Sequence, residues 1–409
     1  MEHQEPQVAL ALSGAGPRRW QWLLQTGAQA AQLPATSVQD RLVVRLPPTP
    51  DCRGAAQEGL TRIEAWLRQG LAVAGFVGYE IGAALEGLPP GPQDDPLPDL
   101  EVVAFHPADL QPCALPQAQP LGVELQLPPS LSCQQPAFEA AVADALQRIA
   151  AGEIYQVNLS LQADVATADL RDLAPLWLLA ALQEAQPVPF GMYLRGDGYA
   201  LLSGSMERFL TVEGGRVRSR PIKGTAPRDP DSVQDRERAL QLRASEKECA
   251  ENTMIVDMVR NDLRRASRRG SVTVPTLLEC VPYATVWHLE SEVQAMLEDP
   301  AATAQWLAAT LPPASVTGCP KVQAMRVIAQ LERRRRGPYC GTAGLWLPDG
   351  RADLSVGIRQ LVLRSHRAEL SVGAGIVADS EPRREWLELC WKARSALRLL
   401  GAMGAGVPA

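Results

Sequence analysis

The chain has 409 residues, of which 46% are hydrophobic and 21% are charged, and its formal net charge is −6. This composition is ordinary for a globular protein built as one large unit or two closely joined units. The acidic balance gives no support for nucleic-acid binding as the main role. No apolar run approaches the ~20 residues that a membrane-spanning helix needs.

Cysteines and basic runs give no sign of a metal cluster or of a basic binding surface. The eight cysteines form no CxxC pair, and the chain has only four histidines, so no Cys/His metal site is expected. The N-terminus lacks the pattern of a signal peptide, and we therefore expect reduced thiols in the cytoplasm. The runs RRASRRG (264–270) and RRRR (333–336) are interpreted as solvated helix ends.

Residues 1–135 differ from the rest of the chain in the pattern of their apolar and proline residues. Short apolar runs lie at 41–46 and 70–82, and proline-rich stretches lie at 88–100 and 111–133. Proline at this density excludes long helices and central strands, so these stretches are predicted to be extended crossings or edge segments.

Residues 136–402 show clear helix and strand patterns. Helices are predicted at 137–152, 174–186, 245–268, 301–310, 320–336 and 382–400. Strands are predicted at 155–165, 191–196, 199–204, 208–214, 216–220, 341–347, 354–363 and 369–376. Several strands are spaced as hairpins, which favours an α+β fold of antiparallel sheets with outer helices.

The stretch RPIKGTAPR (220–228) holds Lys223 between two prolines. It is too short and irregular for a helix. From this pattern alone, Lys223 is either a solvated turn residue or a reactive amine held in a site.

The predicted helix at 245–268 begins with a capping box, Ser245 followed by Glu248. Glu248, Glu251 and Asp262 project into its apolar face, where a carboxylate is costly unless it meets a cation, a metal or a hydrogen-bond donor. They either pair with arginines and cap the helix, or form part of a site.

The last predicted helix places Glu385, Glu388 and Lys392 on one side, next to its apolar face. Two helices that offer carboxylates to the interior could hold Mg²⁺, which needs only one or two carboxylates beside waters and substrate oxygens. Exposed charge pairs explain the same spacing equally well.

Two further segments could bind a carboxylate. The loop at 315–318 delivers backbone N–H groups to the start of the helix at 320–336, which Gly337 is expected to end; a plain capped helix is the alternative. Arg359 is predicted to share a strand face with small residues, where it could clamp a carboxylate or form a structural salt bridge.

Over roughly residues 140–400 the chain resembles the chorismate-utilising enzymes. The matching stretches are GEIYQVNLS (152–160), ERF (207–209), PIKGTAPR (221–228), AENTMIVDMVRNDL (250–263), VWHLESEV (286–293), SVTGCPKVQAMRVI (315–328), RRGPYCGTAGLW (335–346), DLSVGIRQL (353–361) and GAGIVADSEPRREWLELCWKAR (373–394). The resemblance implies two packed antiparallel sheets flanked by helices. It also implies an ancillary region of the anthranilate synthase component I type at 1–135 and a chorismate-binding catalytic region at 136–402.

The resemblance also implies roles for single residues. Glu251 and Glu388 match the Mg²⁺ carboxylates, with Glu248 and Glu385 close by. Glu207 matches a general acid/base near the C4 hydroxyl of chorismate, although Met206 precedes it where many relatives have proline. The positions that match substrate-binding residues are Tyr339, Arg359, His288, Gly375, Lys392 and Thr225.

Two positions indicate the branch of the family. Lysine at 223 is typical of the aminodeoxychorismate synthases, whereas anthranilate synthases usually carry alanine there. Gln156 stands where isochorismate and salicylate synthases place the lysine that activates water. The resemblance therefore implies amination of chorismate at C4 through a covalent Lys223 intermediate, as in p-aminobenzoate and folate biosynthesis.

The chain lacks a glutaminase signature, so ammonia is expected from a separate glutamine amidotransferase subunit. Two rival functions stay open. One is an anthranilate synthase component I, with ammonia entering at C2. The other is a non-catalytic chorismate-binding partner of an amidotransferase.

Overall fold

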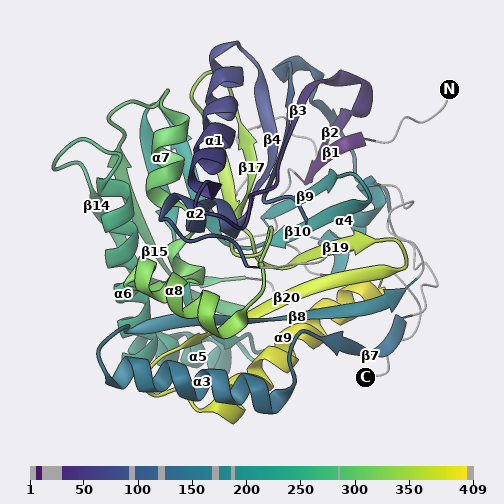
Figure 1. Ribbon diagram of the computed structural model, residues 1–409. Coiled ribbons are helices and arrows are strands. Elements are labelled where there is room, and N and C mark those ends of the chain that lie inside the picture. The colour runs from purple at the N-terminus through teal and green to yellow at the C-terminus, as the bar shows by residue number, and fades with distance from the viewer. Residues whose placement is uncertain are drawn as a thin grey trace.

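Two antiparallel ten-stranded sheets form the centre of the protein, and helices cover them (Figure 1). The computed structural model describes residues 6–11, 30–91, 97–117, 125–167, 175–185, 189–283 and 286–402. This architecture confirms the predicted α+β class with two packed antiparallel sheets.

We call the two sheets A and B. The strands of sheet A, in spatial order, are β16 (Gly318–Cys319), β8 (Gln156–Thr167), β20 (Arg367–Ile376), β19 (Gln360–Arg364), β10 (Tyr199–Ser205), β9 (Phe190–Arg195), β1 (Pro6–Ala11), β2 (Ala30–Pro34) and β6 (Gln111–Cys113), with β7 (Leu125–Leu131) paired to β8. Those of sheet B are β13 (Ile222–Pro227), β15 (Val286–Met296), β12 (Arg216–Arg220), β11 (Arg208–Glu213), β18 (Ala352–Val356), β17 (Thr342–Trp346), β4 (Ala72–Val77), β5 (Leu100–Phe105) and β3 (Val38–Val44), with β14 (Thr273–Pro282) paired to β15.

The helices divide between the two sheets. Those that contact sheet A are α3 (Gln135–Ala150), α4 (Pro175–Ala185), α8 (Lys321–Glu332) and α9 (Pro382–Ala402). Those on the side of sheet B are α1 (Cys52–Arg68), α2 (Tyr79–Leu85), α5 (Ser232–Ala244), α6 (Glu246–Arg264) and α7 (Thr303–Thr310). Three short 3₁₀ turns are η1 (Ala35–Ser37), η2 (Pro107–Asp109) and η3 (Ala314–Val316).

Strand β4 shows how the sequence builds this layered core. Successive side chains of a strand point to opposite faces. Ala74 and Phe76 join the apolar cluster between the two sheets, whereas Val73 and Val77 join the cluster that includes the buried face of α1. Both faces are therefore buried, which explains the unbroken apolar run at 70–82.

Residues before 135 supply strands to both sheets: β1, β2 and β6 extend sheet A, and β3, β4 and β5 extend sheet B. The division at residue 135 stays a prediction. Within the proline-rich stretches, β6 lies at the end of sheet A, as predicted. Strand β5, which begins at Leu100, is paired on both sides, and helix α1 was not predicted.

The interpretation of RRRR as a solvated helix end is wrong. Helix α8 ends at Glu332, before Gly337, because Arg333 adopts a left-handed conformation with φ of 50°. Arg335 and Arg336 are 8% and 4% exposed. Arg336 lies 2.5 Å from Glu332, and Arg335 lies 2.9 Å from Asp99 of the N-terminal part. Each of the two guanidinium groups is therefore buried in an ion pair with a buried carboxylate.

The predicted strand at 354–363 is also corrected. The chain leaves sheet B at the end of β18 and enters sheet A at the start of β19. Arg359 lies in the crossing with φ of 54°. A side chain at Gly357 would place its Cβ 2.3 Å from the carbonyl oxygen of Pro338, so glycine permits the close passage that separates the strands.

No helix in the described part of the chain is long and apolar enough to cross a membrane.

The buried pair of Arg336 and Glu332 yields a stability prediction. Glu332→Gln keeps the shape of the side chain but leaves the Arg336 guanidinium buried without its counter-charge. Denaturant unfolding should show a free energy of unfolding lower by about 3–5 kcal/mol. Glu381→Gln is the matched control, since its pair with Arg384 is exposed, and should change stability by less than about 0.5 kcal/mol. Equal small losses in both variants would contradict the structural role.

Candidate active site

Lys223 lies on β13 at one end of sheet B, where the strand meets helix α6. The next residue, Gly224, has φ of +88°. A Cβ at Gly224 would lie 3.0 Å from Oε2 of Glu248 on α6. Glycine therefore allows both the left-handed conformation and the close approach of β13 to the acidic start of the helix.

The amine of Lys223 reaches across to sheet A. A Cβ at Gly375 on β20 would lie 3.4 Å from Nζ of Lys223 and 2.8 Å from Nε2 of Gln156 on β8. Gln156 is 1% exposed, and its Oε1 has no hydrogen-bond partner among the described residues. The Lys223 amine from sheet B and the buried side-chain amide of Gln156 from sheet A thus approach the same bare stretch of backbone at Gly375.

Burial lowers the pKa of Lys223, and Glu251, Glu207 and Glu388 act in the opposite direction without reversing the shift. In the described part of the chain, no carboxylate lies within salt-bridge distance of its Nζ, and no group accepts a hydrogen bond from it. A half-buried amine with a lowered pKa is suited to nucleophilic attack.

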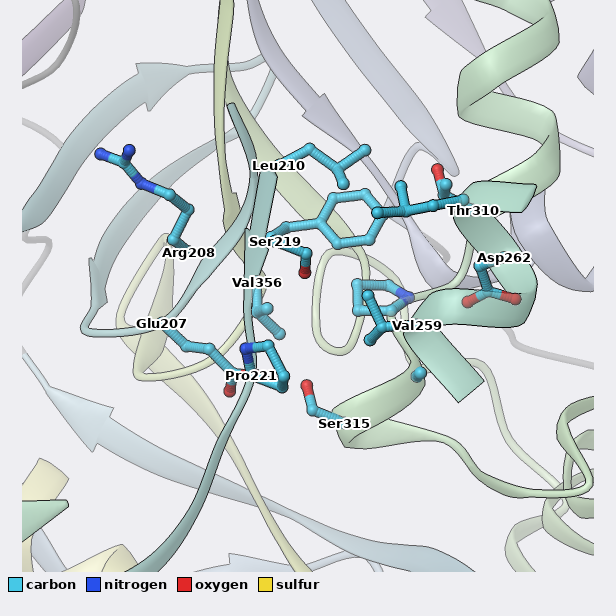
Figure 2. A pocket seen from close by; sticks show the side chains of 14 residues that line it. Glu207, Arg208, Leu210, Ser219, Pro221, Val259, Asp262, Thr310, Ser315 and Val356 are labelled. Atoms are coloured by element: carbon cyan, nitrogen blue, oxygen red, sulfur yellow. The ribbon is translucent and has the colours of Figure 1, made fainter. Parts of the chain in front are cut away.

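Glu207, at the start of β11, is 5% exposed. Burial raises its pKa to about 7, although the Ser315 hydroxyl, Lys223 and the N–H of Ile222 favour the charged form. Figure 2 shows Glu207 and Ser315 beside Pro221 in a narrow cavity, while Arg208 points away from it. A carboxyl group with a pKa near neutrality can donate or accept a proton at physiological pH.

Two carboxylates, Glu251 of α6 and Glu388 of α9, are close enough to Lys223 to act on its pKa. Glu248 of α6 and Glu385 of α9 lie beside them. Burial raises the pKa of Glu251, and Glu248 and Glu385 raise it further. Burial and the charge of Glu388 likewise raise the pKa of Glu385, although the Ser380 hydroxyl donates to it at 2.7 Å. The acidic faces of two helices therefore converge, as their spacing suggested.

Asp262 does not belong to this group. Its carboxylate accepts a hydrogen bond from Nζ of Lys321 at 2.5 Å, and both side chains are 9% exposed. Of the three carboxylates on the face of α6, Asp262 is thus the one that forms a structural ion pair, with Lys321. The Ser245 hydroxyl accepts from the N–H of Glu248, which confirms the predicted cap. The return bond of a capping box is not formed, because the N–H of Ser245 donates to the carbonyl of Leu242.

The four carboxylates offer an incomplete ligand set that suits Mg²⁺. Among the described residues, no group of three or more Asp, Glu, His or Cys side chains is placed to hold a metal. Mg²⁺ does not need one, because it binds through one or two carboxylates and keeps waters and substrate oxygens. Lys247 lies 4.0 Å from Glu251 and Lys392 lies 2.7 Å from Glu388, so cations already approach both side chains. Their oxygens are of the ligand type that Mg²⁺ prefers, and a Mg²⁺ site on Glu251 and Glu388 stays a prediction.

Tyr339 and Arg359 form a second wall. A Cβ at Gly373 on β20 would lie 2.7 Å from the hydroxyl of Tyr339 and 2.8 Å from Nδ2 of Asn158, and Lys392 donates to the carbonyl of Gly373 at 2.8 Å. Burial lowers the pKa of Arg359, which the Tyr339 hydroxyl partly opposes. In the part of the chain that the structure describes, Arg359 has no acidic partner within 4 Å. An unpaired, mostly buried guanidinium suits a carboxylate ligand.

His288 on β15 is buried beside β13. Its Nδ1 lies 3.0 Å from the Thr225 hydroxyl and 3.4 Å from the carbonyl of Gly224, and its Nε2 lies 3.2 Å from Sδ of Met206. Burial lowers the pKa of His288 to about 4. The imidazole is therefore neutral at physiological pH.

The structure thus gathers the predicted residues from both sheets and from α6 and α9, and their roles stay predictions. Sequence reasoning missed Asn158 and gave Ser315 only a loop role. Asn158 could have been found, because residues 156 and 158 share one face of a strand. Of the predicted free N–H groups at 315–318, those of Val316 and Thr317 donate to the carbonyls of Pro313 and Ala314 in η3, and Gly318 pairs with Val157 of β8.

Comparisons with known proteins agree with this geometry. A sequence model described as chorismate binding enzyme matches residues 15–398. Anthranilate synthase component 1 of Thermus thermophilus is 40% identical over 272 residues, covering 66% of this chain and 58% of the relative. Aminodeoxychorismate synthase component 1 of Escherichia coli is 39% identical over 249 residues, covering 61% and 54%. The match spans little more than half of either relative, and their near-equal identities do not favour one activity.

Solved structures of similar fold cover nearly the whole chain. An isochorismate synthase from Bacillus anthracis superposes with a TM-score of 0.73 at 20% identity, covering 98% of this chain and 97% of that one. At this identity the likeness shows the fold alone.

The raised pKa of Glu207 predicts that the free energy of unfolding depends on pH. The folded state holds this proton up to about pH 7, whereas the unfolded chain releases it near its usual pKa of 4.5. Stability should therefore fall as pH rises through this window. Glu207→Gln cannot ionise at this position. The difference in the free energy of unfolding between Glu207→Gln and wild type, measured in urea, should therefore be about 1–3 kcal/mol more favourable to the variant at pH 8.5 than at pH 5. Exposed Glu298→Gln should show no such difference; equal behaviour of the two variants would contradict the prediction.

Proposed function

The chain belongs to the chorismate binding enzyme family, and we propose that it makes 4-amino-4-deoxychorismate from chorismate and ammonia. Lys223 carries this proposal. Its Nζ lies close to Gly375 and Gln156, is engaged by no hydrogen bond within the described residues, and has a lowered pKa. A solvated turn lysine would have neither a lowered pKa nor contacts across to the other sheet.

The first step uses Lys223 as nucleophile and Glu207 as acid. The neutral Nζ bonds to C2 of chorismate, both ring double bonds shift, and the C4–O bond breaks. Glu207 gives its proton to the departing hydroxyl, so water leaves. Covalent catalysis of this kind divides one difficult substitution into two easier ones.

The second step restores the lysine. Ammonia bonds to C4, both double bonds return to their original places, and the C2–N bond breaks to release neutral Lys223. The carboxylate of Glu207 takes the proton that the added ammonia loses. The net change replaces the C4 hydroxyl with an amino group and releases one water.

Other residues hold the substrate during both steps. The unpaired guanidinium of Arg359 and the hydroxyl of Tyr339 would bind the enolpyruvyl carboxylate. Thr225, His288, Lys392 and the Gly375 backbone would line the ring. Glu251 and Glu388 would hold Mg²⁺, with Glu248 and Glu385 beside them. When bound, that ion would neutralise the ring carboxylate and accept charge that moves into the ring.

Ammonia would come from a separate glutamine amidotransferase subunit. A separate lyase would then convert the product to p-aminobenzoate for folate synthesis. Gln156 supports amination over hydration, because its neutral amide cannot act as a strong base on water.

Lys223→Ala tests the covalent step. Wild-type protein with chorismate, Mg²⁺ and ammonium should form aminodeoxychorismate, and the variant should lose at least about 100-fold in kcat, since it removes the nucleophile. Mass spectrometry of acid-quenched wild type should find an adduct at Lys223. Lys247→Ala, which changes an exposed lysine of α6, is the control and should form no less adduct at Lys223 than wild type.

Each rival function predicts a different result. Fluorescent anthranilate as the main product would assign the chain to the anthranilate synthases. Absence of turnover in the wild type, with chorismate bound, would support a silent partner. Unchanged aminodeoxychorismate formation by Lys223→Ala would defeat the covalent mechanism alone.

Glu251→Gln and Glu388→Gln test the metal ligands. Each change removes one carboxylate, so calorimetric titration with Mg²⁺ in the presence of chorismate should show affinity lower by at least about tenfold. Glu246→Gln is the matched control, because Glu246 is exposed in the first turn of α6. Titrations unchanged from wild type in both variants would contradict these ligands.

A further inference from the structure

We propose that Met206 holds the imidazole of His288 as the neutral tautomer that carries its hydrogen on Nε2. The sulfur would act as a temporary acceptor that keeps this N–H ready for an oxygen of the substrate. Met206 is thus a positioning residue, and it acts through His288.

The contacts on both ring nitrogens support this assignment. Sδ of Met206 lies 3.2 Å from Nε2, and the Thr225 hydroxyl lies 3.0 Å from Nδ1. A thioether sulfur carries no hydrogen and can only accept, whereas a hydroxyl can donate. With the hydrogen on Nε2, the imidazole donates to Met206 and accepts from Thr225, so both nitrogens are satisfied.

The other neutral tautomer satisfies only one nitrogen. Hydrogen on Nδ1 could be donated to Thr225 or to the carbonyl of Gly224 at 3.4 Å. Nε2 would then turn a lone pair toward the sulfur, which has nothing to donate. His288 is 5% exposed, and an unsatisfied buried acceptor costs about 1–3 kcal/mol.

The charged imidazolium is also disfavoured. Burial is the main cause of the lowered pKa of His288; the carbonyl of Gly224 opposes this shift without reversing it, and the nearby Arg359 adds to it. The ring of Tyr283 packs edge-on at 5.0 Å between centroids and fixes the plane of the imidazole. The tyrosine hydroxyl is turned away, since it donates to Glu290 at 2.5 Å.

This arrangement has a direct use beside Glu207, the residue that follows Met206. Sulfur is a weak acceptor, so a carboxylate or hydroxyl oxygen of a ligand can replace it without a large cost. The imidazole would then offer a donor that adds no charge and needs no reorientation. Proline, which stands at this position in many of the chorismate-utilising enzymes that the chain resembles, offers no side-chain acceptor.

The tautomer can be read directly in the full-length protein without substrate. Long-range ¹H–¹⁵N correlation spectra distinguish the two neutral forms, and the other three imidazoles of the chain are internal controls. Wild type should show His288 with hydrogen on Nε2. Met206→Leu removes the acceptor and Thr225→Val removes the donor, so each should shift the tautomer ratio toward Nδ1 by roughly tenfold, the effect of one hydrogen bond.

Thr225→Ser is the matched control, because it keeps the hydroxyl and should keep the wild-type ratio. Hydrogen on Nδ1 in the wild type, or an unchanged ratio in both Met206→Leu and Thr225→Val, would overturn the inference. Urea unfolding midpoints close to that of the wild type would show that the variants are folded.

The catalytic use of this donor rests on the proposed function, whereas the tautomer does not. Met206→Leu should lower kcat/KM for aminodeoxychorismate formation by roughly threefold to tenfold. A shifted tautomer with unchanged kcat/KM would remove the role in catalysis but keep the assignment. A wild-type protein that forms no aminodeoxychorismate would defeat the proposed function and leave the spectra valid.

Discussion

The ion pair between Arg336 and Glu332 supports the loop on which one wall of the candidate site depends. The guanidinium donates to both oxygens of Glu332 and to the carbonyl of Asn158 on β8, and it lies 4.7 Å from the ring centroid of Tyr79. The buried guanidinium of Arg336 thereby contacts helix α8 through Glu332, sheet A through Asn158, and helix α2 through Tyr79. Because Tyr339 follows three residues later, its position is set by contacts that lie outside the site.

The buried contacts of Arg336 hold the wall of the site in place, and the site contains charged side chains that the fold does not pair with opposite charges. Lys223 and Arg359 have no carboxylate within salt-bridge distance in the described residues, and Glu251 and Glu385 have raised pKa values because they are buried near other carboxylates. Each of these arrangements costs stability when the site is empty. Anions that meet Arg359 and cations that meet the glutamates would remove that cost, which is a physical basis for binding.

Local patterns predicted the parts of the fold that local chemistry determines. Helices α6 and α9 follow from a cap and a 3.6-residue period, and the acidic faces on them were predicted from the same spacing. The spacing of Glu332 and Arg336 allows an ion pair but does not show whether it is exposed or buried. Its burial depends on Tyr79 and Glu80, about 256 residues away in the chain, so it could not be predicted in this way. The place of Arg359 depends on a crossing between sheets that hairpin spacing does not reveal. The chemistry of Lys223 came from resemblance, since a nine-residue stretch does not show what lies across the site.

The opposite pKa shifts of Glu207 and Lys223 favour an acid and an amine at the same pH. With ordinary pKa values of 4.5 and 10.5, the pair at pH 7 would be a carboxylate and an ammonium, which can neither protonate a leaving hydroxyl nor attack carbon. Burial raises the first pKa to about 7 and lowers the second, because low dielectric disfavours both charged forms. Burial of both groups therefore increases the population in which the acid holds its proton and the amine does not, and this population is the one that the proposed first step requires.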